Sequence, residues 1–371
     1  MKKRIIMTIT LLIFLTACMS NIGSQWRPQV PFWEKKFEYE EVDSIVFFDN
    51  AIWFTTPYYD SEILRFDPKS HQFKSYLMGF EEGKGSNFLL YVSKEQELWG
   101  AGGVYKELDL SLQSTQCKLE KPLWLLSRYD KEHDRFIPVE DEGKILKGCR
   151  VISFTEDDSG NLWVLTSELK DRTYLFKYNP QNNTAYKIDF TAEFADLGLV
   201  DINAVFADPS GVIWFYVRGD IGNNSKFIKI DPITEELVDM GILYEDKGIS
   251  KGLDVFYFDK NGILWTQAHS WGEVQKDRIL WHGLDEEVFK VINYKYETWG
   301  PSIEETSVFQ SILHASNGKT FISTDEGLFV YDPISYKTKK FSSLTSSVIE
   351  DDKGHLWTAL NGQVYRYFLR P

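Results

Sequence analysis

Short stretches that alternate apolar and polar residues fill most of the chain, and turn residues separate them. The clearest set lies between Ile152 and Ile188 and includes the stretch Leu162-Trp163-Val164. A period of two predicts half-buried β-strands, whereas helices would need apolar residues at spacings of three and four over about a dozen residues. This set therefore predicts four short strands joined by turns.

The set recurs along the chain, and each copy has an aromatic residue on its second predicted strand. Strand-only repeats with periods of 36 to 64 residues are typical of β-propeller blades. An aromatic side chain in each copy supplies the packing that neighbouring blades need. The aromatic residues are Trp53, Trp99, Trp163, Trp214, Trp265, Phe321 and Trp357. The sequence predicts an all-β, seven-bladed β-propeller of four-stranded blades.

The turn before the aromatic strand usually contains Gly and Asp. Gly permits the positive φ of a tight hairpin. An Asp side chain in such a turn can accept hydrogen bonds from the local backbone. The residues predicted to do so are Asp158, Asp208, Asp259 and Asp352.

The seventh copy contains only three predicted strands before Pro371. Lys36–Tyr39 precedes the first copy and is similar in pattern to the fourth strand predicted at Phe73–Tyr76. We expect this N-terminal strand to complete the last blade, because closing the ring removes open sheet edges.

Two local patterns are similar to known propeller families. The run Asp157–Trp163, followed by Phe176–Pro180, resembles the repeats of two-component-regulator sensor domains. Ile52–Thr56, followed by Ile63–Pro68, resembles streptogramin lyase repeats. The resemblance covers roughly residues 36–371 and implies a seven-bladed propeller that binds ligands at one mouth of its central channel. Propellers carry many unrelated activities, so the resemblance is more specific for fold than for function.

The N-terminus is typical of an exported protein. Met1–Arg4 is basic, Ile5–Leu15 is apolar, and Leu15–Cys18 resembles a bacterial lipobox. That resemblance implies cleavage before Cys18 and lipid on its thiol and amine. The alternative is an ordinary signal peptide with an incidental cysteine.

These features predict three segments. Residues 1–17 form a lipoprotein signal peptide, residues 18–32 form a lipid-anchored linker, and residues 33–371 form the propeller. Pro28 and Pro31 suggest that the middle segment is a linker. Sorting rules for bacterial lipoproteins imply the outer membrane for a chain with Met19 after the lipidated cysteine, if the host has such a membrane.

Charge narrows the range of partners. Removing residues 1–17 removes three basic residues, which takes the formal net charge from −14 to −17. Such a surface repels phosphate backbones, so nucleic acid is not predicted as a partner. Cys117 and Cys149 are an even pair in an exported protein, and they are either disulfide-bonded or two free thiols.

The candidate ligand-binding residues lie where strands two and three of a blade connect, or where a connection reaches an innermost strand. Tyr58 and Tyr59 could stack on a sugar or an aromatic ligand, or could simply belong to a surface loop. The full candidate set is Tyr58, Tyr59, Arg150, Asn203, Arg218, His269 and Trp271.

Catalysis and cofactors are not predicted, although one loop contains reactive groups. His269 and Glu273 could act as base and acid or hold a metal, or could be ordinary polar loop residues. Streptogramin lyases are expected to place two His and a Glu around Mg²⁺, and only His269 and Glu273 resemble that set. His282 is a further candidate base beyond the next strand.

The sequence therefore predicts a lipid-anchored, extracytoplasmic propeller that binds a glycan, a peptide or an envelope protein. Two alternatives stay open. One is a metal-dependent lyase of the streptogramin-lyase kind, with His269 or His282 as base. The other is a structural subunit of an envelope assembly.

Overall fold

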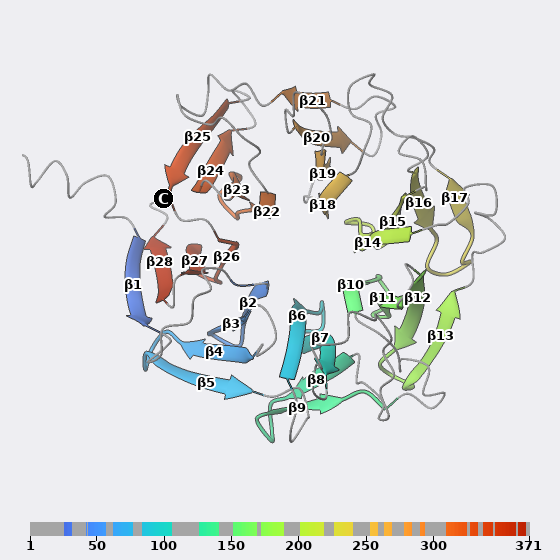
Figure 1. Cartoon of the computed structure of the whole chain (residues 1–371), viewed down its shortest axis with the longest axis horizontal. Helices are drawn as coiled ribbons and strands as arrows, with labels where there is room; N and C mark the ends of the chain where they lie inside the picture. The colour runs from blue at the N-terminus through green and yellow to red at the C-terminus, as the bar shows by residue number, and fades with distance from the viewer. Residues whose placement is uncertain are drawn as a thin grey trace, which may run out of the picture.

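The computed structural model describes residues 26–31, 42, 44–56, 62–76, 84–105, 126–140, 151–168, 172–188, 201–218, 226–239, 253–258, 263–268, 278–283, 290–293, 309–324, 327–332, 337–343, 346–360 and 363–368. Within these ranges all regular secondary structure is β-strand. Figure 1 shows the strands grouped into sheets around a central axis. No helix in these ranges is long and apolar enough to cross a membrane.

The described strands form seven four-stranded antiparallel sheets, which we number as blades in chain order. Blade 1 contains β2 (Ser44–Phe48), β3 (Ala51–Thr55), β4 (Ile63–Asp67) and β5 (Gln72–Tyr76). Blade 2 contains β6 (Lys84–Val92), β7 (Leu98–Tyr105), β8 (Leu126–Asp130) and β9 (Arg135–Pro138). Blade 3 contains β10 (Val151–Glu156), β11 (Leu162–Glu168), β12 (Arg172–Asn179) and β13 (Thr184–Ile188). Blade 4 contains β14 (Asp201–Ala207), β15 (Ile213–Arg218), β16 (Lys226–Ile230) and β17 (Leu237–Asp239).

The remaining blades complete the ring. Blade 5 contains β18 (Leu253–Phe258), β19 (Ile263–Ala268), β20 (Arg278–Gly283) and β21 (Lys290–Asn293). Blade 6 contains β22 (Phe309–His314), β23 (Thr320–Thr324), β24 (Gly327–Asp332) and β25 (Lys337–Ser342). Blade 7 contains β26 (Val348–Glu350), β27 (His355–Leu360), β28 (Gln363–Phe368) and, as its outermost strand, β1 (Trp26–Pro31). The innermost strands β2 and β26 contact each other, so the last blade meets the first.

The N-terminal strand completes the last blade, as predicted, but the predicted position of this strand is wrong. It is Trp26–Pro31 that pairs antiparallel with β28, with Trp26 opposite Tyr367. This strand falls in the stretch predicted as a linker, and Lys36–Tyr39 lies outside the described residues. The two prolines of the stretch suggested a linker, yet a proline is tolerated on an edge strand because its missing N–H can face solvent.

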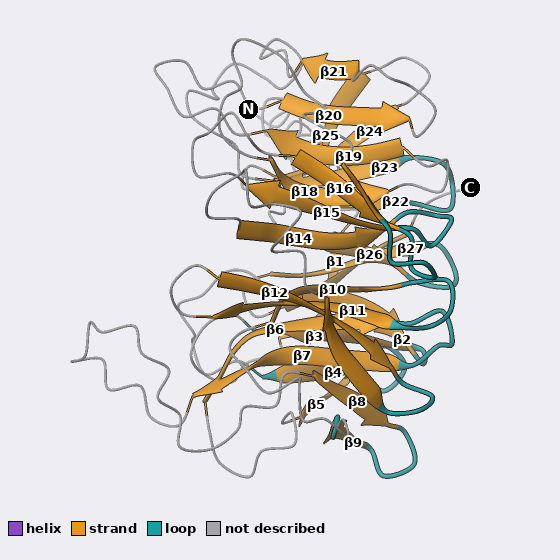
Figure 2. Ribbon diagram, turned by 90° about the vertical axis from the view of Figure 1, so that its right-hand side faces the viewer, coloured by secondary structure: helices purple, strands orange, loops and turns teal. Residues whose placement is uncertain are grey.

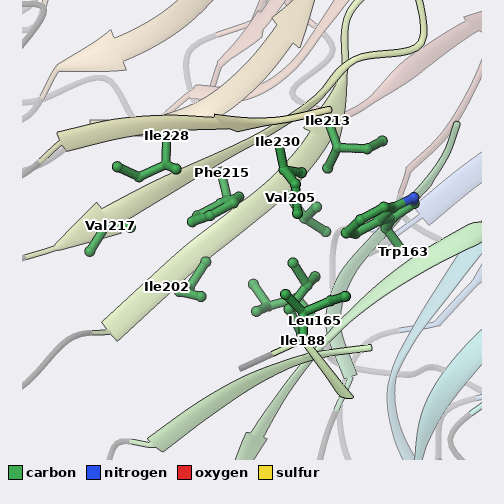
Figure 3. Close-up of a cluster of buried hydrophobic side chains, with 11 residues drawn as sticks. Trp163, Leu165, Ile188, Ile202, Val205, Ile213, Phe215, Val217, Ile228 and Ile230 are labelled. Carbon is green, nitrogen blue, oxygen red and sulfur yellow. The ribbon is translucent and has the colours of Figure 1, made fainter. Parts of the chain in front are cut away.

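In the six blades whose second-strand aromatic side chain the structure describes, this residue packs toward the next blade. Figure 3 shows one such interface, where Trp163 of blade 3 meets Val205 and Ile213 of blade 4. Trp163 and Ile213 are fully buried there. Trp53 packs in the same way against Phe136 of blade 2, at a ring-centroid distance of 6.1 Å. The hydrophobic core is thus a series of interfaces between blades rather than one central cluster.

Among the described turns, a buried or partly buried hydrogen bond between Asp and Trp holds the first hairpin in three blades. Asp157 Oδ2 accepts from Trp163 Nε1 at 2.9 Å. Asp208 does the same for the indole of its blade, and Asp351 for Trp357. The prediction for Asp208 is confirmed, because its side chain also accepts from local backbone N–H groups.

The predictions for Asp158 and Asp352 are wrong by one residue. The carboxylate six residues before the tryptophan makes the bonds, which is Asp157 in blade 3 and Asp351 in blade 7. Asp158 instead points outward, with 58% of its side chain exposed, and pairs with Lys94. Asp259 lies outside the described residues.

Blades 1 and 6 lack this aspartate. In blade 6 the aromatic residue is Phe321, which has no N–H to donate, and the residue six positions earlier is Ala315. In blade 1 the turn is shortened to Asp49-Asn50, both with positive φ, and Trp53 Nε1 donates to the Phe48 carbonyl at 3.2 Å. Blade 1 thus uses a backbone carbonyl in place of the aspartate, and blade 6 has no indole N–H that needs an acceptor.

A cation on the third strand covers the ring of the tryptophan in five blades. Each cation lies directly across the strand pair from its tryptophan, as Arg65 does from Trp53 and Lys177 does from Trp163. The distances to the ring centroids are 5.7 Å and 5.2 Å for these two pairs. The other three pairs are Arg128 with Trp99, Lys229 with Trp214, and Arg366 with Trp357. In blade 6 the residue opposite Phe321 is Val330, which carries no charge.

Replacing Asp157 by Ala should lower the free energy of unfolding by roughly 2–3 kcal/mol, because several buried donors lose their acceptor. Asp157 is fully buried and accepts from Ser159 N, Asn161 N and Trp163 Nε1. The matched control is Asp158→Ala, which removes an exposed ion pair and should change stability by less than about 0.5 kcal/mol. Urea unfolding of both variants measures the difference in stability. Equal effects would contradict the assignment of Asp157, rather than Asp158, as the buried acceptor.

Deleting residues 26–31 should lower the melting temperature by about 5 °C or more, because β28 then becomes an unpaired edge. Deleting residues 19–25 in an otherwise identical chain is the control and should leave the melting temperature near that of the intact chain. Differential scanning calorimetry compares the two. A ring closed by Lys36–Tyr39 would show no drop for the first deletion.

Candidate functional site

The ring has two chemically different ends, which we name by their connections. The turn face carries the hairpins between the first and second strands and between the third and fourth strands of each blade. Figure 2 shows described turns gathered on this side of the ring. The loop face is the opposite end, where the second strands end, the third strands begin, and successive blades are joined. This division follows from the antiparallel order of every sheet.

The two faces differ in the length of their connections. On the turn face, Asp49-Asn50 joins β2 to β3 and residues 157–161 join β10 to β11. At the loop face, residues 106–125 separate β7 from β8, and residues 294–308 separate β21 from β22. Long connections are where proteins usually place binding groups, so the loop face is the candidate functional site.

Most of the predicted site residues belong to these loop-face segments. They lie outside the described residues, so their roles stay predictions. This group comprises Tyr58, Tyr59, Arg150, His269, Trp271 and Glu273. The predicted lipidation site Cys18 and the predicted disulfide pair Cys117 and Cys149 also lie outside the described residues.

Two predicted residues are placed together on blade 4. Arg218 is the last residue of β15 and pairs with Asp201, the first residue of β14. Asn203 lies on β14 at a register shift between Ile202 and Ala204. The topology thus brings Arg218, Asp201 and Asn203 to the loop-face end of one innermost strand pair.

The register shift at Asn203 is one of a repeated set that the sequence did not reveal. The innermost strands of blades 2 to 6 all shift register close to the loop face. The shifts lie at Ser86/Leu89, Val151/Ser153, Ile202/Ala204, Asp254/Phe256 and Phe309/Ser311. Bulges of this kind re-aim side chains at barrel rims and beside binding sites. A bulge adds one residue to a strand and so shifts the alternation of apolar and polar residues by one position. A shift of one position is too small to detect in a single sequence.

His282 is placed away from the other candidate base. It lies on β20 opposite Leu264, near the start of β19 and the turn face. Ala268, the residue before His269, is at the other end of β19. His282 therefore lies near the opposite face of the blade from the point where the loop with His269 begins.

A cavity of about 500 Å³ opens on the turn face between blades 2 and 3. Its charged lining residues largely pair with one another. Arg128 Nη1 donates to Glu97 Oε1 at 3.1 Å, and Lys94 pairs with Asp158. These pairs leave little unused charge for a ligand, so the cavity is a weaker candidate than the loop face.

Glu156 lines the same cavity and joins the two blades. It is 2% exposed, and its Oε2 accepts from Lys94 N at 2.7 Å and from the Tyr91 hydroxyl at 3.3 Å. Burial raises the pKa of Glu156 and outweighs the opposing effect of these two hydrogen bonds. Glu350 holds the turn of blade 6 in the same way, accepting from Ser316 N at 2.7 Å. In blades 3 and 7 the carboxylate before the Asp of the turn is therefore a link to the preceding blade.

A second link joins blades 1 and 2 at the outer edge. Asp134, in the β8–β9 turn, accepts from the Tyr129 hydroxyl at 2.6 Å and from the Tyr76 hydroxyl at 2.7 Å. Lys74 of β5 pairs with the same carboxylate. Desolvation opposes ionisation of Asp134, but the three hydrogen bonds outweigh it and lower its pKa to about 2.

Within the described ranges, no group of three or more His, Cys, Asp or Glu side chains is arranged to hold a metal ion. The residues that resemble the streptogramin lyase set, His269 and Glu273, are outside those ranges.

The closed ring of four-stranded sheets defines the chain as a β-propeller protein, and solved structures share this fold. The sequence matches no protein-family model, and no curated protein is detectably similar to it. The extracellular domain of BT4673 from B. thetaiotaomicron, described as a hybrid two-component system, matches with a TM-score of 0.62 at 17% identity. PorZ, described as an essential surface component of the type-IX secretion system of Porphyromonas gingivalis, matches with a TM-score of 0.60 at 11% identity.

The matches differ in how much of the other protein they cover. The similarity to BT4673 covers 92% of this chain but 42% of the other, and that to PorZ covers 89% and 46%. The chain thus spans less than half of either protein. YCF48 from Cyanidioschyzon merolae matches over nearly its whole length, with 92% of this chain and 98% of the other covered, a TM-score of 0.58 and 10% identity. Identities this low show a shared fold and leave function to be argued from the chain itself.

Asp134→Asn should weaken the pH dependence of stability between about pH 4 and pH 2. The folded state holds this carboxylate ionised at a pH where the unfolded chain is already protonated, so its contribution is present above pH 3.8 and is lost as pH falls toward about 2. Urea midpoints measured from pH 5 to pH 2 test this. The control is Glu132→Gln in the same turn, which should follow the intact protein. A slope unchanged by Asp134→Asn would contradict the link.

Proposed function

We propose that the protein is a lipid-anchored, extracytoplasmic β-propeller that binds a ligand or protein partner at the cell envelope through its loop face. The observation that carries the proposal is the asymmetry of the ring. Short hydrogen-bonded turns occupy one face, and every long connection begins and ends at the other.

The cellular location of the protein is part of the proposal and rests on the sequence. A basic start, an apolar stretch and Leu15–Cys18 favour export and lipidation at Cys18. Two of the similar structures support this location in a general way, since one is an extracellular domain and the other belongs to a bacterial surface component. We therefore assign the protein to the bacterial cell envelope, on the outer membrane where the host has one.

The partner would meet a rim of polar and aromatic side chains. Tyr58, Tyr59 and Trp271 come from loop-face segments of blades 1 and 5, and Arg150, Asn203 and Arg218 come from the ends of innermost or second strands. Aromatic rings and a few fixed polar groups suit a glycan or a peptide, as well as the surface of an envelope protein.

Photo-crosslinking in the bacterial host tests the loop face as the binding surface. A crosslinking amino acid replaces Tyr58 or Trp271 in the full chain, and matched variants carry it at Gln96 or Lys131, which lie on turn-face hairpins. We expect a discrete crosslinked species from the loop-face positions and none from the turn-face positions. Crosslinks from Gln96 or Lys131 alone would overturn the assignment of the binding face.

Two further measurements separate the parts of the proposal. Metabolic labelling with palmitate should mark the intact chain but not Cys18→Ser, and equal labelling would refute the anchor. A thermal-shift comparison with Mg²⁺ and with EDTA addresses the lyase alternative, because a metal that binds the folded state raises the melting temperature. A stabilisation by metal that is lost in His269→Ala would favour the lyase over the binding module.

A further inference from the structure

We propose that the turn face of the propeller lies toward the membrane that holds the Cys18 lipid, and that the loop face points away from it. The inference rests on the lipid anchor of the proposed function and adds the orientation of the ring. It is carried by the place where the chain joins the propeller.

The chain joins the ring at the turn face. The β26–β27 hairpin belongs to that face, so β27 starts there and the antiparallel strand β28 returns to it and ends at Phe368. β1 runs antiparallel to β28, with Trp26 opposite Tyr367 and Pro31 opposite Gln363. The first residue of β1 therefore lies at the turn-face end, on the outermost strand of blade 7.

The chain between the anchor and this point is short. Cys18 precedes Trp26 by eight residues, which span at most about 29 Å when fully extended. The six residues of β1 already cover about 20 Å between the two faces. A lipid on Cys18 could reach the level of the loop face only if roughly two-thirds of the tether's maximum length ran along the blade. Because the tether is short and attached at the turn face, the turn face stays nearer to the bilayer on average.

The chemistry of the turn face permits a close approach. Its described hairpins are short, and Ile233, in the β16–β17 turn, is 82% exposed. Phe368, at the turn-face end of β28, is 40% exposed. The net charge of −17 that remains after loss of residues 1–17 gives no general attraction to anionic lipid, so the tether rather than electrostatics sets the orientation.

Energy transfer to the membrane surface tests the orientation. The full chain is isolated from its host membrane and reconstituted into liposomes that carry an acceptor dye on a lipid headgroup. A fluorescent amino acid replaces Gln96 on the turn face or Glu62 at the loop-face start of β4. Transfer from position 96 should exceed that from position 62 by about twofold or more, since the faces are about one strand, ~20 Å, apart. Equal transfer, or stronger transfer from position 62, would overturn the proposal.

Two variants of the experiment distinguish a wrong orientation from a missing lipid anchor. Inserting a flexible Gly-Ser segment of about 20 residues before Trp26 adds a mean reach of about 25 Å and should reduce the difference between the two positions. Coupling Cys18 of the chain lacking residues 1–17 to a maleimide lipid, with Cys117→Ser and Cys149→Ser, tests the same geometry without the host's acylation. Unequal transfer in this arm, with no lipid found on Cys18 of the host protein, would refute the natural anchor while supporting the orientation.

Discussion

The structure depends on how each tryptophan of a second strand is held. In blades 1 to 4 and 7, its ring fills the interface with the next blade and lies beneath a cation of the third strand. In blades 1, 3, 4 and 7 its indole N–H also donates to an acceptor in the first hairpin. In blade 3 these roles fall to Trp163 of the second strand, Asp157 of the turn before it and Lys177 of the third strand. A single side chain thereby couples the first hairpin, the third strand and the neighbouring blade. In blade 6 all three positions differ together, because Phe321 occurs with Ala315 and Val330.

Much of the fold could be predicted from the sequence, because the same strand pattern repeats and repetition averages out local exceptions. The seven copies, the strand type and the closure by an N-terminal strand all follow from periodicity and from the missing fourth strand of the last copy. The closing strand itself was misplaced, since Pro28 and Pro31 argue against a central strand and nothing in one sequence marks an edge. The aspartate of the turn was misassigned in blades 3 and 7 because two adjacent Asp residues are equally good turn formers there. Only the distance to the indole N–H decides between them.

The candidate site was less predictable than the fold. The position of Tyr58 or Trp271 between two predicted strands tells which face of the ring the residue belongs to. Whether such side chains converge on one site depends on loop conformation, and the repeat pattern of the sequence does not predict loop conformation. The structurally important residues that the sequence did not reveal are those that contact a neighbouring blade. Glu156 looks like any turn carboxylate, yet it is buried and accepts from Lys94 of the preceding blade. A signal was present for the cations, since Arg65, Arg128, Lys177 and Lys229 all stand two residues before the Asp or Asn of the following turn.

The least regular blade shows how the ring tolerates variation. Blade 2 has Ser93 where blades 3, 4 and 7 have the buried Asp, and the Ser93 hydroxyl accepts from Glu97 N within that turn. Support comes instead from blade 3, because Glu156 accepts from Lys94 N and from Tyr91. The cavity of about 500 Å³ described above opens at this same interface. A ring of repeated interfaces can thus lose one internal contact and replace it with a contact from the neighbouring blade. The same redundancy leaves the loop face free to vary in length and chemistry, because the interactions that close the ring are concentrated in the strands and at the turn face.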